Sequence, residues 1–344
     1  MRRFALATAL YIAALSPAQT RPASIPASQP ELEGLAAIRA EANELAPLLK
    51  SELARRFVAS VESLPAIAPR EFLRDPQTRR FYAKASVAAL PEETQTRLRP
   101  DVLDESYYYT TRYGTPLAYS RALDLLAEHG FTDLAGKRVL DFGYGNIGQL
   151  KLMASLGADM VGVDVDPNLL ELYSEPSDQG RVAGRHGRDG SVKLVCGRWP
   201  AEEDAKAAVG GDFDLILSKN TLKNGYINPE RPVDKRMLVD LGVDAQIYVK
   251  TLHASLRPGG RVMIYNICPA PSKPEEPYKP WADGRCPFPR EMWTSAGFTV
   301  IEFDVIDDEA VRRMGHALGW DAGERPMDLA HDLFAWWTLV EKSR

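Results

Sequence analysis

Residues 139–148 read Val139-Leu140-Asp141-Phe142-Gly143-Tyr144-Gly145-Asn146-Ile147-Gly148. They predict an apolar strand, an acidic residue, a glycine-rich turn and then a helix that starts near Gln149. Glycines let the backbone turn tightly and approach a ligand closely, and the first turn of a helix offers free N–H groups. The stretch therefore indicates a binding site for a nucleotide-type cofactor.

A second short strand follows roughly twenty residues later and reads Val161-Gly162-Val163-Asp164. At that spacing the carboxylate of Asp164 is placed to bind the two hydroxyl groups of a ribose. The ribose site and the glycine-rich turn would then belong to one cofactor site.

Two cofactors fit these residues. Gly143, Gly145 and Gly148 match the G-x-G-x-x-G pattern of dinucleotide-binding folds, which alone is a weak indication. Asp141 separates the alternatives, because a carboxylate at the mouth of the turn would repel a pyrophosphate. S-adenosylmethionine carries a sulfonium and an ammonium group, and a nearby carboxylate favours both. The residues therefore favour S-adenosylmethionine, with a nicotinamide dinucleotide as the alternative.

The rest of the chain alternates strands and helices. The strands that we expect lie near residues 138–142, 159–163, 192–196, 213–217, 261–265, 298–305 and 334–340. This alternation predicts an α/β fold with a doubly wound, mostly parallel, seven-stranded Rossmann-like sheet. Its ligand is expected at the carboxyl ends of the strands.

The turn Leu256-Arg257-Pro258-Gly259-Gly260 precedes the fifth expected strand. Together with the glycine loop, it resembles the class I S-adenosylmethionine-dependent methyltransferases over about residues 106 to 341. The resemblance implies that Asp141 lies beside the methionine part of the cofactor, that the loop glycines pass beneath it and that Asp164 binds the ribose. The cofactor-binding residues that it implies are Asp141, Gly143, Tyr144, Gly145, Asn146, Gly148, Asp164, Val165 and Ser218.

Candidate catalytic residues follow the fourth expected strand, whose end faces the transferring methyl group in the resembled fold. Asn220 could orient the acceptor, while Lys219 or Tyr226 could bind an acidic group or take a proton. For the lysines, ordinary loop charge is the alternative. The segment lacks the paired prolines that often occur here in enzymes acting on nucleobases or glutamine. Nucleobases and glutamine are therefore less expected as substrates.

Two further residues are candidates for cofactor contacts. Arg112, in a segment dense in tyrosines, could pair with the cofactor carboxylate, and Trp199, after the third strand, could stack on adenine. Packing of the tyrosine segment and a core position for Trp199 are the alternatives.

The N-terminal third is expected to be an extension of the catalytic domain. Residues 19–30, rich in Pro, Ala and Ser, read as a linker, and 31–105 as a helical cap with a break at Pro47 and further helix around 72–90. Residues 106–344 then form the methyltransferase domain. A proline-rich loop at about 266–289, containing Tyr278, Trp281 and Phe288, is expected to act as a lid.

The first residues have the layout of a secretory signal peptide. Arg2 and Arg3 precede an apolar run, and Ser16-Pro17-Ala18 offers small residues for cleavage after Ala18. The run is too short to span a bilayer comfortably. We therefore expect export to the periplasm or the medium, with an unprocessed leader and a cytoplasmic protein as the alternative. The source of S-adenosylmethionine for an exported enzyme stays open.

Charge and cysteine content limit the partners. The 344 residues carry a formal charge of −5 without a long basic run, which makes nucleic acid an unfavoured partner. Cys196, Cys268 and Cys286 show no metal-ligand spacing. In an exported protein Cys268 and Cys286 could form a disulfide, and Cys196 is expected to be a small core residue.

These observations predict an S-adenosylmethionine-dependent methyltransferase. Its acceptor is expected to be a small molecule, because a cap and a lid suggest an enclosed pocket. An NAD(P)-dependent oxidoreductase and a non-catalytic module that keeps the fold are the alternatives. The acceptor atom and the oligomeric state stay open.

Overall fold

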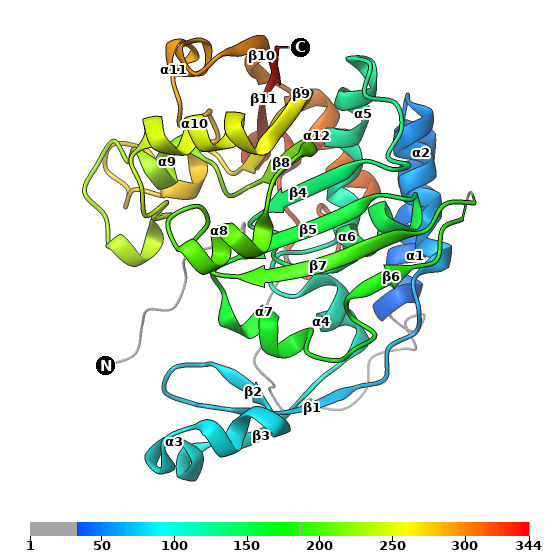
Figure 1. The fold of residues 1–344 in the computed structure, drawn as a ribbon, viewed down its shortest axis with the longest axis vertical. Helices are drawn as coiled ribbons and strands as arrows, with labels where there is room; N and C mark the ends of the chain where they lie inside the picture. Colours follow the sequence, from blue (N-terminus) through cyan, green and yellow to red (C-terminus); the bar gives the residue numbers. More distant parts are fainter. Residues whose placement is uncertain (1–32, 186, 344) are drawn as a thin grey trace.

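A computed structural model describes residues 33–185 and 187–343. It contains a large eight-stranded sheet with helices on both faces and a separate three-stranded sheet (Figure 1). The expected signal peptide at 1–18 and linker at 19–30 lie outside the described residues.

The large sheet confirms the predicted α/β fold. In spatial order its strands are β10 (Phe298–Ile306), β11 (Phe334–Lys342), β9 (Leu256–Cys268), β8 (Phe213–Lys219), β4 (Arg138–Phe142), β5 (Asp159–Asp164), β7 (Gly190–Cys196) and β6 (Gly180–Val182). The strands from β7 to β9 run parallel in the order 3-2-1-4-5 of a doubly wound sheet, whereas β11 is antiparallel to both of its neighbours.

Seven of these strands lie where the sequence predicts them, but the sheet has eight. The additional strand is β6, which pairs antiparallel with β7 at the edge of the sheet. It is only three residues long, and none of them is buried, so it has no apolar pattern from which it could be recognised.

Both faces of the central strands are buried, which explains their continuous apolar sequences. In β4, Val139 joins the hydrophobic core on one face and Leu140 the core on the other, and Leu215 and Ile216 of β8 alternate in the same way. The first core contains α5 (Ser120–Glu128), α6 (Gly148–Ser155) and α12 (Asp308–Ala317), and the second contains α8 (Glu203–Val209), α10 (Ala245–Ser255) and α11 (Arg290–Ser295).

Two helices open the described chain, α1 (Gly34–Leu45) and α2 (Glu52–Ala59). A short 3₁₀ turn over Ala46–Leu48 separates them and contains Pro47, so the predicted break is confirmed. The helix α2 packs along α5, and α1 packs against α4 (Glu105–Thr110). The N-terminal helices therefore extend the core on one face of the large sheet (Figure 1).

The expected helix around 72–90 is wrong over its first half. There the chain forms an antiparallel sheet of β1 (Arg70–Arg74), β2 (Phe81–Ala83) and β3 (Arg99–Leu103), which lies beneath α4 in Figure 1. The pair Asp75-Pro76 starts the turn between β1 and β2, because proline disfavours helical backbone in the residue before it. A short 3₁₀ segment, Lys84–Ala89, and α3 (Glu92–Arg97) follow β2.

The remaining helices are α7 (Pro167–Leu172), α9 (Asn224–Ile227) and α13 (Leu329–Asp332). Within the described ranges, 33–185 and 187–343, no helix combines the length and apolar character needed to span a membrane.

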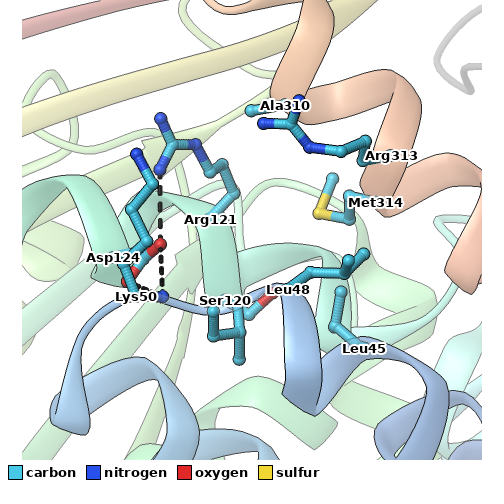
Figure 2. A pocket seen from close by; sticks show the side chains of 10 residues that line it. Leu45, Leu48, Lys50, Ser120, Arg121, Asp124, Ala310, Arg313 and Met314 are labelled. Carbon is cyan, nitrogen blue, oxygen red and sulfur yellow. Dashed lines mark hydrogen bonds and ion pairs between the residues drawn. The ribbon is translucent and has the colours of Figure 1, made fainter.

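Asp124 docks the N-terminal helices onto the large domain. Its carboxylate accepts hydrogen bonds from the backbone N–H groups of Ser51 (2.6 Å) and Lys50 (3.2 Å) at the start of α2, and pairs with Arg121 on its own helix. Lys50, Arg121 and Asp124 line a small cavity of about 30 Å³, and Figure 2 shows them across from Met314 of α12.

Asp178 attaches the small sheet in a similar way. Its carboxylate, 1% exposed, receives two parallel hydrogen bonds from Arg70 of β1, both 2.8 Å long, and one of 2.7 Å from the Tyr108 hydroxyl. Bidentate pairs of this kind fix orientation as well as distance. Asp178 is therefore a buried attachment point of the small sheet, alongside Asn168 and Glu171, which accept the N–H groups of Phe81 (3.1 Å) and Ala83 (2.8 Å) of β2.

We predict that Asp178→Ala lowers the free energy of unfolding by about 3 kcal/mol, because it removes the buried carboxylate of Arg70 and leaves the guanidinium only the exposed Glu175 and the carbonyl oxygen of Leu172. Chemical denaturation monitored by circular dichroism measures the change. Glu309→Ala is the matched control, since Glu309 pairs with Arg313 on an exposed surface, and it should leave the midpoint nearly unchanged. Equal, small effects of both variants would contradict the assigned role of Asp178.

Candidate active site

A cavity of about 480 Å³ lies at the carboxyl ends of β4, β5 and β8. Its wall combines the glycine loop, the residues after β5 and β8, part of the segment 112–119 and part of the segment 236–240. The volume is within the range of small-molecule sites, about 300–1,000 Å³. Ligands of doubly wound sheets bind at this edge, so the cavity is the candidate site.

The first two glycines of the loop are required by its backbone. Gly143 has φ +74° and Gly145 has φ +62°, a left-handed conformation that side chains disfavour. A Cβ on Gly143 would also lie 2.1 Å from Oγ1 of Thr221, and one on Gly145 would lie 2.8 Å from the ring of Tyr113. The loop therefore packs tightly against the residues that follow β8 and against the tyrosine segment.

Gly148 has a different role from the one expected. It begins α6, is buried and does not line the cavity, and a Cβ there would lie 2.8 Å from Pro116. Its N–H donates to Oδ1 of Asn146 (3.1 Å), and the N–H of Ile147 donates to the Tyr173 hydroxyl (3.2 Å). The N–H groups at the start of α6 are thus hydrogen bonded within the protein. Gly148 allows α6 to pack closely against Pro116.

Asp164 lies in the cavity wall at the end of β5. Its two carboxylate oxygens accept the N–H groups of Gly145 (3.2 Å) and Asp166 (2.9 Å). Burial raises the pKa of Asp164 to about 6 despite these bonds. Each oxygen retains a lone pair for a further donor, so the carboxylate can accept hydroxyl groups of a ligand.

Asp141, expected beside the cofactor, is fully buried and does not line the cavity. Its carboxylate accepts hydrogen bonds from the Tyr119 hydroxyl (3.2 Å) and from Nε2 of Gln149 (3.0 Å). Burial raises the pKa of Asp141 to about 7, against these two bonds and the nearby charge of Lys219. Asp141 can therefore influence the cavity through Tyr119, which donates a hydrogen bond to it, and through Lys219, on which its charge acts. Both of these residues line the cavity.

Of the other residues predicted to bind the cofactor, some line the cavity and one does not. Tyr144, Asn146 and Val165 line the cavity, and Val165 is 62% exposed. Ser218 does not, because it is fully buried and its Oγ accepts the N–H of Leu222 (3.3 Å). The assignment of Ser218 to the site is therefore not supported by its position.

The three predicted catalytic residues all line the cavity: Lys219, Asn220 and Tyr226. Asn220 has φ +65°, and its Oδ1 accepts the N–H of Ile267 (2.7 Å) at the end of β9. Its amide oxygen therefore holds the backbone of the site, which leaves its NH₂ group to face a ligand.

Lys219 and Lys223 differ sharply although both are enclosed. Nζ of Lys223 donates to the carbonyl oxygens of Ile267 (2.5 Å) and Trp281 (3.1 Å), so this lysine fastens loops. Nζ of Lys219 lies 5.1 Å from the centre of the Tyr119 ring. Burial lowers the pKa of each lysine to about 8.

Arg112 and Trp199, the two further candidates, also line the cavity. Nη2 of Arg112 donates to Asp166 (2.7 Å) and to the Tyr113 hydroxyl (2.8 Å), so its guanidinium is paired within the protein. Trp199 is buried and packs against Phe142 with ring centres 6.1 Å apart.

The loop beside the cavity, called the covering segment below for the role that we assign to it, is not the one expected. No residue of 266–289 lines the cavity, whereas Arg236, Leu238, Val239 and Asp240 do. The proline-rich loop instead packs on α9, where Asn224 donates to Asp283 (2.7 Å). The covering segment directly follows β8 and α9, and that position in the chain is the signal that could have identified it.

All three cysteines are free. Cys268 and Cys286 are buried without a disulfide between them, and Cys196 is exposed rather than in the core. Cys196 is the last residue of β7, where the strand reaches the surface.

Comparison with solved structures gives low similarity. Neighbours include the (4+2)-cyclase SpnF (16% identity, 68% of this chain and 84% of that chain, TM-score 0.40). A phosphoethanolamine N-methyltransferase 2 from Haemonchus contortus matches with 15% identity over 72% and 63% of the chains (TM-score 0.38). The magnesium protoporphyrin IX methyltransferase of Synechocystis PCC 6803 matches with 14% identity over 65% and 77% (TM-score 0.33).

No family model matches the chain. Ubiquinone biosynthesis O-methyltransferases from strains of Xanthomonas oryzae pv. oryzae are 35% identical over 92 residues, which is 27% of this chain and 34% of theirs. The match thus spans about a third of these relatives. The sheet order, the left-handed glycine loop and this local similarity together identify the fold as that of the class I S-adenosylmethionine-dependent methyltransferases, in agreement with the resemblance found in the sequence.

Proposed function

We propose that the chain is an S-adenosylmethionine-dependent methyltransferase that acts on a small molecule. The observation that carries this proposal is the cavity at the carboxyl ends of β4, β5 and β8, with the glycine loop and the Asp164 carboxylate in its wall. When bound, the cofactor would supply a methyl group activated by a sulfonium.

The residues of the wall fit such a cofactor. Asp164 has free lone pairs for the ribose hydroxyl groups, and Gly143 and Gly145 line the cavity with backbone in the tight turn that glycine permits. Next to Asp164, Val165 presents an exposed apolar side chain suited to the face of an adenine. These residues would hold the nucleoside, and the wall from Lys219 to Tyr226 would then face the acceptor.

The hydrogen bonds at the start of α6 disfavour a dinucleotide as the cofactor. A pyrophosphate needs free N–H groups at a helix N-terminus. Here the N–H groups of Ile147 and Gly148 are bonded to Tyr173 and Asn146, and neither residue lines the cavity. A nicotinamide cofactor would therefore lack its main anchor.

The protein's contribution to methyl transfer would be orientation and exclusion of water. A cavity of about 480 Å³ with a covering segment at 236–240 suits a small acceptor better than a macromolecule. Since the matched relatives are named O-methyltransferases, oxygen is the first acceptor atom to test.

We predict that S-adenosylhomocysteine binds the wild-type protein and that Asp164→Asn weakens binding about 10- to 100-fold, because hydrogen bonds to a charged group contribute about 1.5–3 kcal/mol. Isothermal titration calorimetry measures both affinities. Asp159→Asn is the matched control, since Asp159 begins the same strand at its other end and bonds Ser191.

In the same experiment, NAD binding without S-adenosylhomocysteine binding would favour the oxidoreductase. If neither ligand binds, the fold would be that of a non-catalytic module. Binding without turnover on any tested hydroxyl compound would also favour the non-catalytic alternative.

Affinity for S-adenosylhomocysteine should fall as the pH drops below about 6. Burial raises the pKa of Asp164 to about 6, so its carboxylate gains a proton through this range and loses acceptor capacity. The decline should approach about tenfold per pH unit, as expected for one linked proton. Titrations from pH 5 to 8 test this, and an equally steep decline in Asp164→Asn would assign it to another group.

We also propose export by the N-terminal signal, which is supported by the basic, apolar and small-residue order of residues 2–18. Expression of the full chain in a bacterium should yield a periplasmic protein whose first residue is Gln19, as determined by N-terminal sequencing. A cytoplasmic protein that retains Met1 or Arg2 would refute export.

A further inference from the structure

Lys219 presents an unpaired charge to the cavity. Its side chain lines the wall, and within the part of the chain that the structure describes its ammonium has no hydrogen bond and no ion pair. The acid whose charge acts on Lys219, Asp141, already accepts hydrogen bonds from Tyr119 and Gln149. An enclosed charge without a partner is unfavourable, so this position is suited to an anion that arrives with a ligand.

The other cations of the wall are already engaged. Arg112 pairs with Asp166, Arg198 with Asp240 at 3.4 Å, and Arg236 with Asp234. Lys223 is bonded to two carbonyl oxygens. Among the described residues that line the cavity, Lys219 is therefore the cation left to bind a ligand.

The surroundings of Lys219 are aromatic. Nζ lies 5.1 Å from the centre of the Tyr119 ring, a cation–π arrangement that favours the charged amine. Tyr113, Tyr226 and Phe142 line the same cavity. Such walls favour a flat apolar ring, and a single cation at their edge matches one negative charge better than the two of a phosphate.

We propose that the methyl acceptor is a hydroxyl group on an aromatic ring, bound as its oxyanion by the ammonium of Lys219. This inference rests on the proposed methyltransferase function. It assigns to Lys219 a catalytic role, because the amine would contact the reacting oxygen.

The step balances as a simple transfer. The acceptor hydroxyl loses its proton to solvent, and its oxygen forms a bond to the methyl carbon while the bond from that carbon to the cofactor sulfur breaks, with its electron pair kept by sulfur. The oxyanion would lie between the positive sulfonium and the positive ammonium. Both charges stabilise the ionised nucleophile, since an opposite charge within about 4–6 Å favours the charged form.

The test uses 4-nitrophenol, whose ionised form absorbs visible light, added to protein saturated with S-adenosylhomocysteine. In the wild type the pKa of the bound probe should fall by about one to three units relative to the free probe. Lys219→Met should abolish this shift, whereas Lys219→Arg, which keeps the charge, should retain most of it. Absorbance titration against pH measures each shift.

Two controls isolate the charge. Lys250→Met changes an exposed lysine of α10 that does not line the cavity and should behave as wild type. The neutral ether 4-nitroanisole should bind wild type and Lys219→Met equally, because it has no charge to pair.

S-adenosylhomocysteine affinity, measured first by calorimetry, keeps the two proposals distinguishable and shows that each variant is folded. Loss of binding in the wild type would refute the proposed function itself. Weaker binding only in Lys219→Met would mean that Lys219 pairs with the cofactor carboxylate, and would overturn the inference. Normal binding with no shift of the probe that depends on Lys219 would overturn it as well.

Discussion

The carboxyl group of Asp141 connects the elements around the cavity. It joins β4 to Tyr119, in the 3₁₀ turn Pro116–Tyr119, and to Gln149 of α6, and its charge acts on Lys219 of β8. Burial raises its pKa to about 7, above its ordinary value. Its neutral form therefore favours folding fully at acid pH, and that contribution is lost as the pH rises through about 7. At neutral pH the two donors and Lys219 must offset the charge, which fixes these residues in place.

Buried and partly buried carboxylates contribute to how the N-terminal segment docks. Asp124 accepts the N–H of Ser51, the residue before α2, Asp178 holds β1 through Arg70, and Glu105 accepts the N–H groups of Leu35 (2.9 Å) and Ile67 (2.8 Å). A buried carboxylate is strongly unfavourable unless donors surround it. Each of the three is therefore satisfied in one docking position, which gives the cap a defined place on the large domain.

Sequence patterns predicted those features of the fold that depend on neighbouring residues in the chain. The seven strands were identified by apolar runs, and the loop glycines by a turn that only left-handed backbone can make. Which side chains at a strand end reach the cavity was not predicted in the same way. Neighbouring side chains point to opposite faces of the sheet, so adjacent residues can differ in this respect. Asp141 and Ser218 thus lie inside the core, whereas Lys219, next to Ser218, reaches the cavity.

Long-range contacts account for the other differences. Asp178 binds the small sheet through Arg70, about a hundred residues away in the chain, and the proline-rich loop is held on α9 by Lys223 and Asn224. Such pairings have no signature in a single sequence. The packing role of Gly148 followed only from the folded structure, whereas the segment 236–240 had one sequence signal, its position after β8 and α9.

The large sheet itself separates the two charges that a ligand would meet. Asp164 ends β5 and Lys219 ends β8, on either side of β4. Parallel strands lie about 4.8 Å apart, so two spacings place the strand ends about 10 Å apart at one edge of the sheet. This separation is set by backbone hydrogen bonds and not by loops, so neither charge needs to move when a ligand binds. A preorganised charge stabilises a developing reaction without further rearrangement.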